Sequence, residues 1–320
     1  MQSPGIRTSQ RWARRSAFTG ALVWLLLQLI WLADSYETDL IERILLLGVL
    51  VIVPLGLPLI PKSPRQAPFI YWLALLLQPF GAVAVIASTF LERGVGGALL
   101  ASLWLIFSVT TALFGLWRLR SPELQSAEEL SIDAALLYLP VGAVWLVMSR
   151  MGIQPLGFGA TIVLLTAVHF HFAGFAAPLL AGLAGRRLSE QRSFKTTFRF
   201  TVLGIIAGTP LVAAGLTFSP VVGLVGTIVI SIGLVSLAVI VSFAIVPVVK
   251  FVVVQVFLLI SSLSSVPAMF LACVYAYSLA TQTLIVDIPQ MATTHGILNA
   301  FGFALCGLLG WSILHSAEPS

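Results

Sequence analysis

Residues 156–184 read LGFGATIVLLTAVHFHFAGFAAPLLAGLA, a stretch of apolar and small residues that contains no Lys, Arg, Asp or Glu. A run of about 20 apolar residues is long enough to cross the hydrocarbon core of a bilayer as an α-helix. Similar runs fill most of the chain, which is 59% hydrophobic and 9% charged and has a mean hydropathy of +1.04. Soluble domains carry roughly 25% charged residues. The sequence therefore predicts an integral membrane protein.

The apolar runs predict an all-α fold, a polytopic transmembrane helix bundle of about ten spans. The strands of a membrane β-barrel alternate polar and apolar residues, whereas these runs are continuously apolar. The polar stretches between them are too short to form a core of their own, so residues 1–320 are treated as a single transmembrane domain with a basic N-terminal segment at 1–16. The spans are predicted near 17–33, 41–60, 68–91, 95–117, 132–149, 157–184, 198–217, 220–247, 251–280 and 294–314.

The basic residues of the loops predict the orientation of these spans. With the N-terminus inside, all but three of the 17 Lys and Arg residues fall on the cytoplasmic side, the exceptions being Arg43, Arg93 and Arg150. Short cytoplasmic loops of membrane proteins carry such an excess of positive charge. Both termini are therefore predicted to be cytoplasmic. The net charge of +5 follows from this sidedness and is scattered over separate loops, so the expected partner is the lipid bilayer and not a nucleic acid.

Three of the four histidines lie in two of the predicted spans, at His169, His171 and His295. Ionisable side chains inside a membrane are costly, and they usually mark functional sites. His169 and His171 are two residues apart, about 200° around an ideal helix, so we expect only one of them to face a cavity. The alternative is structural: each histidine is a neutral imidazole that donates a hydrogen bond to a carbonyl of a neighbouring helix.

The helical spacing groups further residues with these histidines. His295, Asn299 and Gly302 are four and seven residues apart and share one face of a helix, while Gly174 lies on the same face as His171. A glycine allows another helix or a ligand to approach closely. We therefore predict a site in which the substrate-binding residues are His169, Asn299, Gly174 and Gly302 and the catalytic or proton-handling residues are His171, His295, Asp34 and Asp287.

The two carboxylates are included because Asp34 and Asp287 lie at the outer ends of spans, where they could reach into a vestibule. A carboxylate beside an imidazole raises its pKa and gives an acid–base pair that works near neutral pH. Three histidines also suit zinc, but helical zinc motifs space their ligands by three or four residues, so no metal or other cofactor is expected. The serine-rich run 261–267 predicts a broken or hydrated helix, unless its hydroxyls bond back to their own helix.

The segments 168–182 and 294–303, read together, resemble the YndJ-like family of bacterial integral membrane proteins. The resemblance implies a multi-pass protein of the bacterial plasma (inner) membrane. It also implies a role in transport, because the family is commonly labelled a transporter. Some relatives carry an additional soluble portion.

Two functions from different classes fit these observations. The first is a proton-coupled secondary transporter of a small solute, whose cavity is lined by His169 or His171 with His295 and Asn299. Against it, the two halves of the chain show no inverted repeat. The second is a membrane-embedded enzyme in which a histidine and a carboxylate act on a lipophilic substrate, in a hydration, isomerisation, ring opening or cyclisation. A scaffold in the membrane is a third interpretation, and the sequence does not give the oligomeric state.

Overall fold

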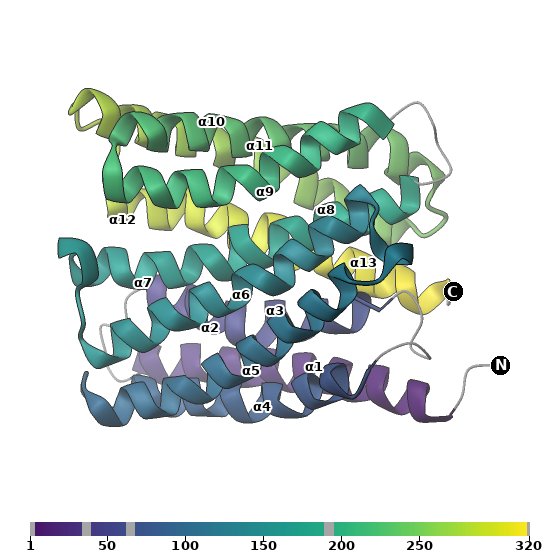
Figure 1. Ribbon diagram of the computed structural model, residues 1–320, viewed down its shortest axis with the longest axis horizontal. Helices are drawn as coiled ribbons and strands as arrows, with labels where there is room; N and C mark the ends of the chain where they lie inside the picture. The colour runs from purple at the N-terminus through teal and green to yellow at the C-terminus, as the bar shows by residue number, and fades with distance from the viewer. Residues whose placement is uncertain (1–3, 34–39, 62–67, 189–194, 319–320) are drawn as a thin grey trace. The chain divides into compact units, whose positions relative to one another are not determined.

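The computed structural model describes residues 4–33, 40–61, 68–188 and 195–318, and within these ranges the regular secondary structure is helical, without a strand (Figure 1). Helix α1 (Pro4–Ala33) contains the apolar stretch Arg15–Trp31, which matches the first predicted span. In the described part of the chain, nine further helices are long and apolar enough to cross a membrane: Leu40–Leu59, Phe69–Thr89, Val95–Leu119, Ala127–Met151, Ala160–Leu188, Thr196–Phe218, Pro220–Val248, Val252–Thr281 and Ile288–Ala317. The predicted polytopic helix bundle is confirmed, while the cytoplasmic location of the termini stays a prediction.

The chain divides into two compact units, which are described separately. Unit 1 comprises Met1–Ser121 and Leu136–His171, and unit 2 comprises Pro122–Ala135 and Phe172–Pro319. Unit 1 contains α1, α2 (Leu40–Leu47), α3 (Val53–Gly56), α4 (Phe69–Thr89), α5 (Val95–Leu119), most of α6 (Ala127–Met151) and α7 (Ala160–His169). Unit 2 contains the start of α6, α8 (Ala177–Leu188), α9 (Lys195–Phe218), α10 (Pro220–Ile240), α11 (Val252–Thr281), α12 (Ile288–Met291) and α13 (Cys306–Ala317).

The second span forms the core of unit 1. Its sequence from Ile44 to Ile60 contains no polar side chain, and all of these residues are buried. Helix α1 packs on it so closely that Gly20 lies directly against the Leu50 carbonyl. Helices α4 and α5 form an antiparallel hairpin, in which Gly81 allows the backbone of α4 to approach Trp104. Such small residues let membrane helices come within van der Waals contact, which is a main source of their association.

Unit 2 is built around a tight hairpin of α9 and α10. Pro220 occupies the first turn of α10, where its missing N–H costs no hydrogen bond, and Gly215 of α9 meets Gly223 of α10 backbone to backbone. Helix α11 packs on α10 and also on the last span. It ends at Gln282, whose left-handed conformation (φ 55°) stops the helix.

Several spans are interrupted by π-helical segments. They are η1 (Gly48–Ile52), η6 (Phe170–Ala176), η8 (Val241–Ile245), η10 (Ala292–Gly296) and η11 (Leu298–Leu305). A π turn inserts an extra residue into the hydrogen-bond ladder, shifts the register of the side chains and is frequently found at functional sites. His171, His295 and Asn299 all lie in such segments, so the hydrogen-bond register at these three residues differs from the ideal α-helix on which the spacing arguments were based.

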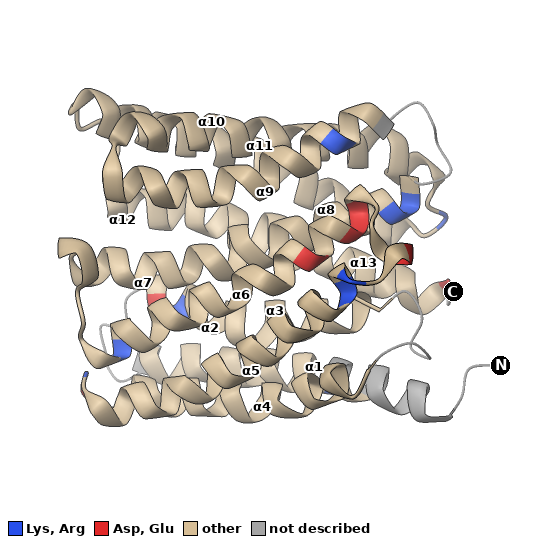
Figure 2. Ribbon diagram, in the orientation of Figure 1, with Lys and Arg blue, Asp and Glu red and all other residues tan. Residues whose placement is uncertain are grey.

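Charged side chains cluster toward the ends of the helices, and the middles of the spans are formed by other residues (Figure 2). This distribution is the one a bilayer requires, because a charge in the hydrocarbon has no water to solvate it. The few charged residues that are buried therefore need hydrogen-bonding partners within the protein, and three of them, Glu129, Asp133 and Arg150, are described with the site below.

Candidate functional site

His171 is fully buried in unit 1, in the π-helical segment that follows α7. Its Nδ1 lies 2.7 Å from the Ala167 carbonyl oxygen, and its Nε2 lies 2.9 Å from the indole Nε1 of Trp104 on α5. A carbonyl can only accept a hydrogen bond and an indole N–H can only donate one. The imidazole is therefore neutral, with its proton on Nδ1, and both ring nitrogens are committed to bonds within the unit.

The surroundings of His171 fix the ring in this position. Trp104 is fully buried, and its ring stacks on the imidazole with centroids 5.9 Å apart while it also contacts Phe107 at 4.6 Å. On the side of α6, Gly142 leaves room for the ring, since a Cβ atom there would come within 2.9 Å of His171 Nδ1. The environment of His171 is that of a packed core side chain with a satisfied hydrogen-bonding pattern.

His169 points the other way. It is exposed, and its Nδ1 lies 2.7 Å from the carbonyl oxygen of Leu165, one turn earlier in its own helix. One histidine of the pair is thus exposed and the other buried, as their angular separation predicts.

His295 and Asn299 form a polar pair in unit 2, in the π-helical part of the last span. The Nδ1 of His295 lies 2.8 Å from the Ala268 carbonyl oxygen of α11, so this nitrogen carries a proton and donates it to the carbonyl. The Asn299 amide donates to the His295 main-chain carbonyl at 2.9 Å, and the same nitrogen lies 3.3 Å from both ring nitrogens. Both side chains are half-buried. The pair of residues predicted from helical spacing is therefore in direct contact.

Two serines of α11, Ser261 and Ser264, face the same span. We call the contact between Ser261–Ser265 of α11 and Asn299–Phe303 the serine seam. Ser261 donates to the Phe303 carbonyl at 2.7 Å, and Gly302 lies directly against the Ser264 side chain. Ser265 instead bonds back to the Ser262 carbonyl of its own helix at 2.8 Å. Helix α11 runs unbroken through this run and Pro267, so the prediction of a broken helix is wrong, and both back-bonding and interhelical bonds occur.

The predicted carboxylates have other surroundings. Asp287 caps α12: its Oδ1 accepts a hydrogen bond from the Gln290 amide at 2.8 Å, and the Gln290 side chain bonds back to the Asp287 N–H. Asp34 lies outside the described residues. Gly174 is buried in unit 2 within the same π-helical segment that holds His171. Within the described ranges, no three His, Cys, Asp or Glu side chains are grouped as a metal site would need.

Two buried acids at the start of α6 were not predicted. Glu129 is fully buried and forms a bidentate ion pair with Arg186 of α8, with N–O distances of 2.8 and 2.7 Å. Asp133, one turn later, is also fully buried. The sequence carries a signal for both, because Asp133 lies inside the span predicted from residue 132, where a charge is expensive, and Glu129 lies one turn before it.

Arg150 is a third buried charge that sequence reasoning treated as a loop residue. It ends α6, and its guanidinium donates to the carbonyls of Ser88 and Leu91 and lies 3.4 Å from the Glu42 carboxylate. The last carbonyls of a helix have no partner within that helix, and a cation satisfies them well. Arg150 thus closes the end of α4 and joins it to α2 and α6.

Comparison with known proteins gives the family. Residues 43–303 match the family described as YndJ-like protein. The chain belongs to the YndJ-like family. The family predicted from the two histidine segments is therefore confirmed, and the match extends over all but the ends of the chain.

A relative from Bacillus subtilis (strain 168), named "Uncharacterized membrane protein YndJ", is 31% identical over 291 residues. The alignment covers 90% of this chain and 51% of that protein, so the YndJ-like chain spans about half the length of its relative. No solved structure matches this YndJ-like chain. The comparisons thus agree with a membrane protein.

Proposed function

We propose that this YndJ-like protein moves a small solute across the bacterial plasma membrane, and that His295 binds and releases a proton during the transport cycle. The observation that carries the proposal is the position of His295. It is a half-buried ionisable side chain within a membrane span, in a π-helical segment, and it is joined to Ala268 of α11 and to Asn299.

Ionisable residues within membrane helices mark solute and proton pathways, and many transporters bind their substrates where a helix departs from regular α geometry. Around His295 both conditions are met within one unit. Asn299 and the serine seam extend the polar surface along the same two helices, α11 and the last span. A solute that forms hydrogen bonds would find donors and acceptors along this line.

The hydrogen bonds favour His295 over His171 as the proton-binding group. A proton added to Nε2 of His295 leaves its Nδ1–H bond to Ala268 intact, and the Asn299 amide, which lies 3.3 Å from Nε2, keeps its shorter hydrogen bond to the His295 carbonyl. A proton added to Nε2 of His171 would point at the Trp104 N–H, so two donors would face each other and the bond would be lost. Protonation of His171 would therefore also disturb the packing of Trp104 against His171 in the core of unit 1.

The test uses the full chain, purified and reconstituted into liposomes that contain the pH-sensitive dye pyranine. Amino acids, sugars, polyols, carboxylates, and sodium and potassium salts are added outside in turn, and the internal pH is followed. We expect one solute class to change the internal pH in the wild type. The change should be lost in His295→Ala and weakened in Asn299→Ala.

His315→Ala is the matched control, because His315 lies near the end of α13, away from the predicted site residues in the sequence. It should retain the wild-type response. Solute-dependent proton movement that persists in His295→Ala at the wild-type rate would refute the role of His295. A solute that is chemically converted and not transported would instead support the membrane-embedded enzyme.

A further inference from the structure

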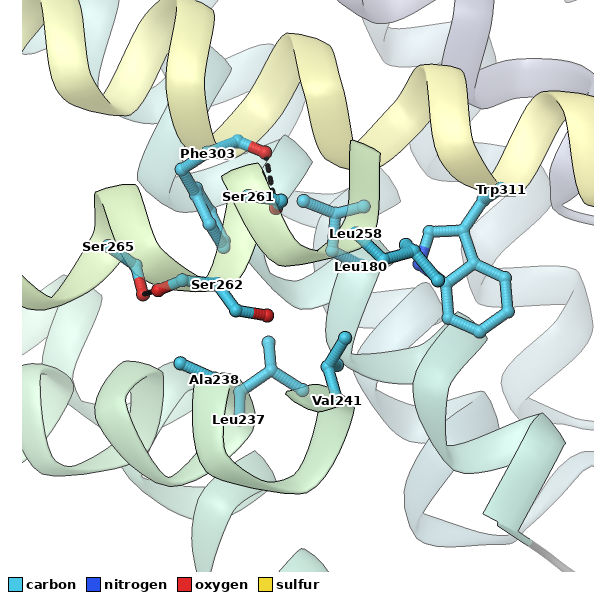
Figure 3. Close-up of a pocket in the computed structure, with 10 residues that line it drawn as sticks. All are labelled: Leu180, Leu237, Ala238, Val241, Leu258, Ser261, Ser262, Ser265, Phe303 and Trp311. Carbon is cyan, nitrogen blue, oxygen red and sulfur yellow. Dashed lines mark hydrogen bonds between the residues drawn. The ribbon is translucent and has the colours of Figure 1, made fainter. Parts of the chain in front are cut away.

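A small cavity of about 20 Å³ lies inside unit 2, between α10, α11 and the last span (Figure 3). Its wall is mainly apolar, from side chains such as Leu237 and Phe303, but it also includes Ser261, Ser262, Ser265 and Trp311. It adjoins the serine seam, because Ser261 and Phe303 contribute to both. The cavity belongs to neither of the histidine environments described above.

Two polar groups at this cavity have no hydrogen-bond partner in the described part of the chain. Ser261 and Ser265 donate to main-chain carbonyls, whereas neither the Ser262 hydroxyl nor the Trp311 indole N–H forms a hydrogen bond with another described residue. Both residues are more than nine-tenths buried, with 5% and 7% of their surfaces exposed. Figure 3 shows the Ser262 hydroxyl pointing away from α11, toward Leu237 and Val241. A buried polar group left without a partner costs about 1–3 kcal/mol.

We propose that this cavity is a binding site for one water molecule, held by the Ser262 hydroxyl. A cavity holds a water molecule when the volume open to the centre of a water-sized sphere is roughly 10–15 Å³. The cavity in unit 2 has about 20 Å³ and is therefore large enough for one water. A bound water also needs two to four polar partners. The Ser262 hydroxyl can donate or accept, the oxygens of Ser261 and Ser265 can still accept, and the Trp311 N–H can donate.

The chemistry of the wall excludes an ion as the occupant. None of the ten residues that line the cavity is Asp, Glu, Lys, Arg or His. A charge placed there would be desolvated without a counter-charge, which costs far more than burying a neutral hydrogen-bonding molecule. The site is therefore selective for an uncharged, water-sized molecule, and it hydrates the contact between α11 and the last turn of α10, next to the π-helical segment that begins at Val241.

The proposal is tested with the full chain at a resolution that shows ordered waters. We expect a density peak within hydrogen-bonding distance of Ser262 Oγ. Two substitutions of equal size form the matched pair: Ser262→Thr keeps the hydroxyl and Ser262→Val replaces it with a methyl group. The peak should remain in Ser262→Thr and disappear in Ser262→Val. An empty cavity in the wild type, or a peak that persists in Ser262→Val, would overturn the proposal.

A second measurement works in solution and does not depend on crystals. X-ray-generated hydroxyl radicals label side chains that contact water, and in lipid nanodiscs Trp311 should be oxidised severalfold faster than Trp104. Trp104 is the reference because it is a buried tryptophan whose N–H is already bonded to His171. Ser262→Val should lower the Trp311 rate severalfold and leave the Trp104 rate unchanged. Equal Trp311 rates in the wild type and in Ser262→Val would contradict a water bound by Ser262.

Discussion

Replacing Trp104 with Phe removes the indole N–H that donates a hydrogen bond to His171. The imidazole Nε2 is then buried without a hydrogen-bond donor. The unsatisfied acceptor should cost about 1–3 kcal/mol. The smaller ring leaves space at a fully buried position, which adds about 1 kcal/mol. We therefore expect Trp104→Phe to lower the free energy of unfolding by about 2–4 kcal/mol. Trp117→Phe on the same helix is the control, because Trp117 is 40% exposed and its substitution should cost less than about 0.5 kcal/mol.

The hydrogen bond is separated from the lost ring volume by a double-mutant cycle with His171→Phe. Free energies of unfolding are measured by reversible SDS denaturation in mixed micelles for the wild type, the two single variants and the double variant. We expect a coupling energy of about 1 kcal/mol, near the upper part of the range for hydrogen bonds inside membrane proteins. A coupling energy indistinguishable from zero would show that the Trp104–His171 bond does not stabilise unit 1.

Two further predictions use the same denaturation assay. Glu129→Gln should destabilise the protein by about 2–4 kcal/mol, because it leaves Arg186 at a largely buried site without its counter-charge, whereas Glu318→Gln, in a half-exposed pair, should change stability by less than about 0.5 kcal/mol. If the two substitutions lowered the free energy of unfolding equally, burial of the ion pair would not explain the stability that Glu129 provides. Gly302→Ala should cost about 1–3 kcal/mol because its methyl group would overlap the Ser264 side chain. Adding Ser264→Gly should restore much of the free energy of unfolding that Gly302→Ala removes. If it restored none, the overlap with Ser264 would not be the cause of the destabilisation.

The sequence predicted the helices well because each is defined by a local property. An uninterrupted apolar run such as 156–184 has to span the bilayer as a helix, since no other single-segment structure satisfies its backbone in hydrocarbon. The prediction of the family was also local, because it rested on short segments around His171 and His295. The division into two compact units, in contrast, depends on which helices pack together, and a hydropathy pattern does not contain that information.

The site was predicted only in part, for reasons of geometry. The contact between His295 and Asn299 follows from residues spaced by four along one helix, and the structure contains it. The π-helical segments were not predicted, because a change of hydrogen-bond register leaves no simple mark in composition. Asp287 was expected to pair with an imidazole, but its carboxylate caps the helix that it precedes. The joint role of the predicted site residues stays a prediction.

The amino-acid sequence by itself determined that this protein lies in a membrane, which segments are long and apolar enough to cross it and which few residues are costly there. These properties follow from the free energy of transferring each side chain from water to hydrocarbon. That free energy depends mainly on the side chain itself and little on its neighbours. Only the tertiary structure decided the chemical state of those costly residues. His171 is a neutral acceptor because Trp104, 67 positions earlier in the chain, donates to it, and the Glu129 carboxylate is paired with Arg186 on another helix. Hydrogen-bonding partners are chosen by packing, and packing is a property of the folded chain.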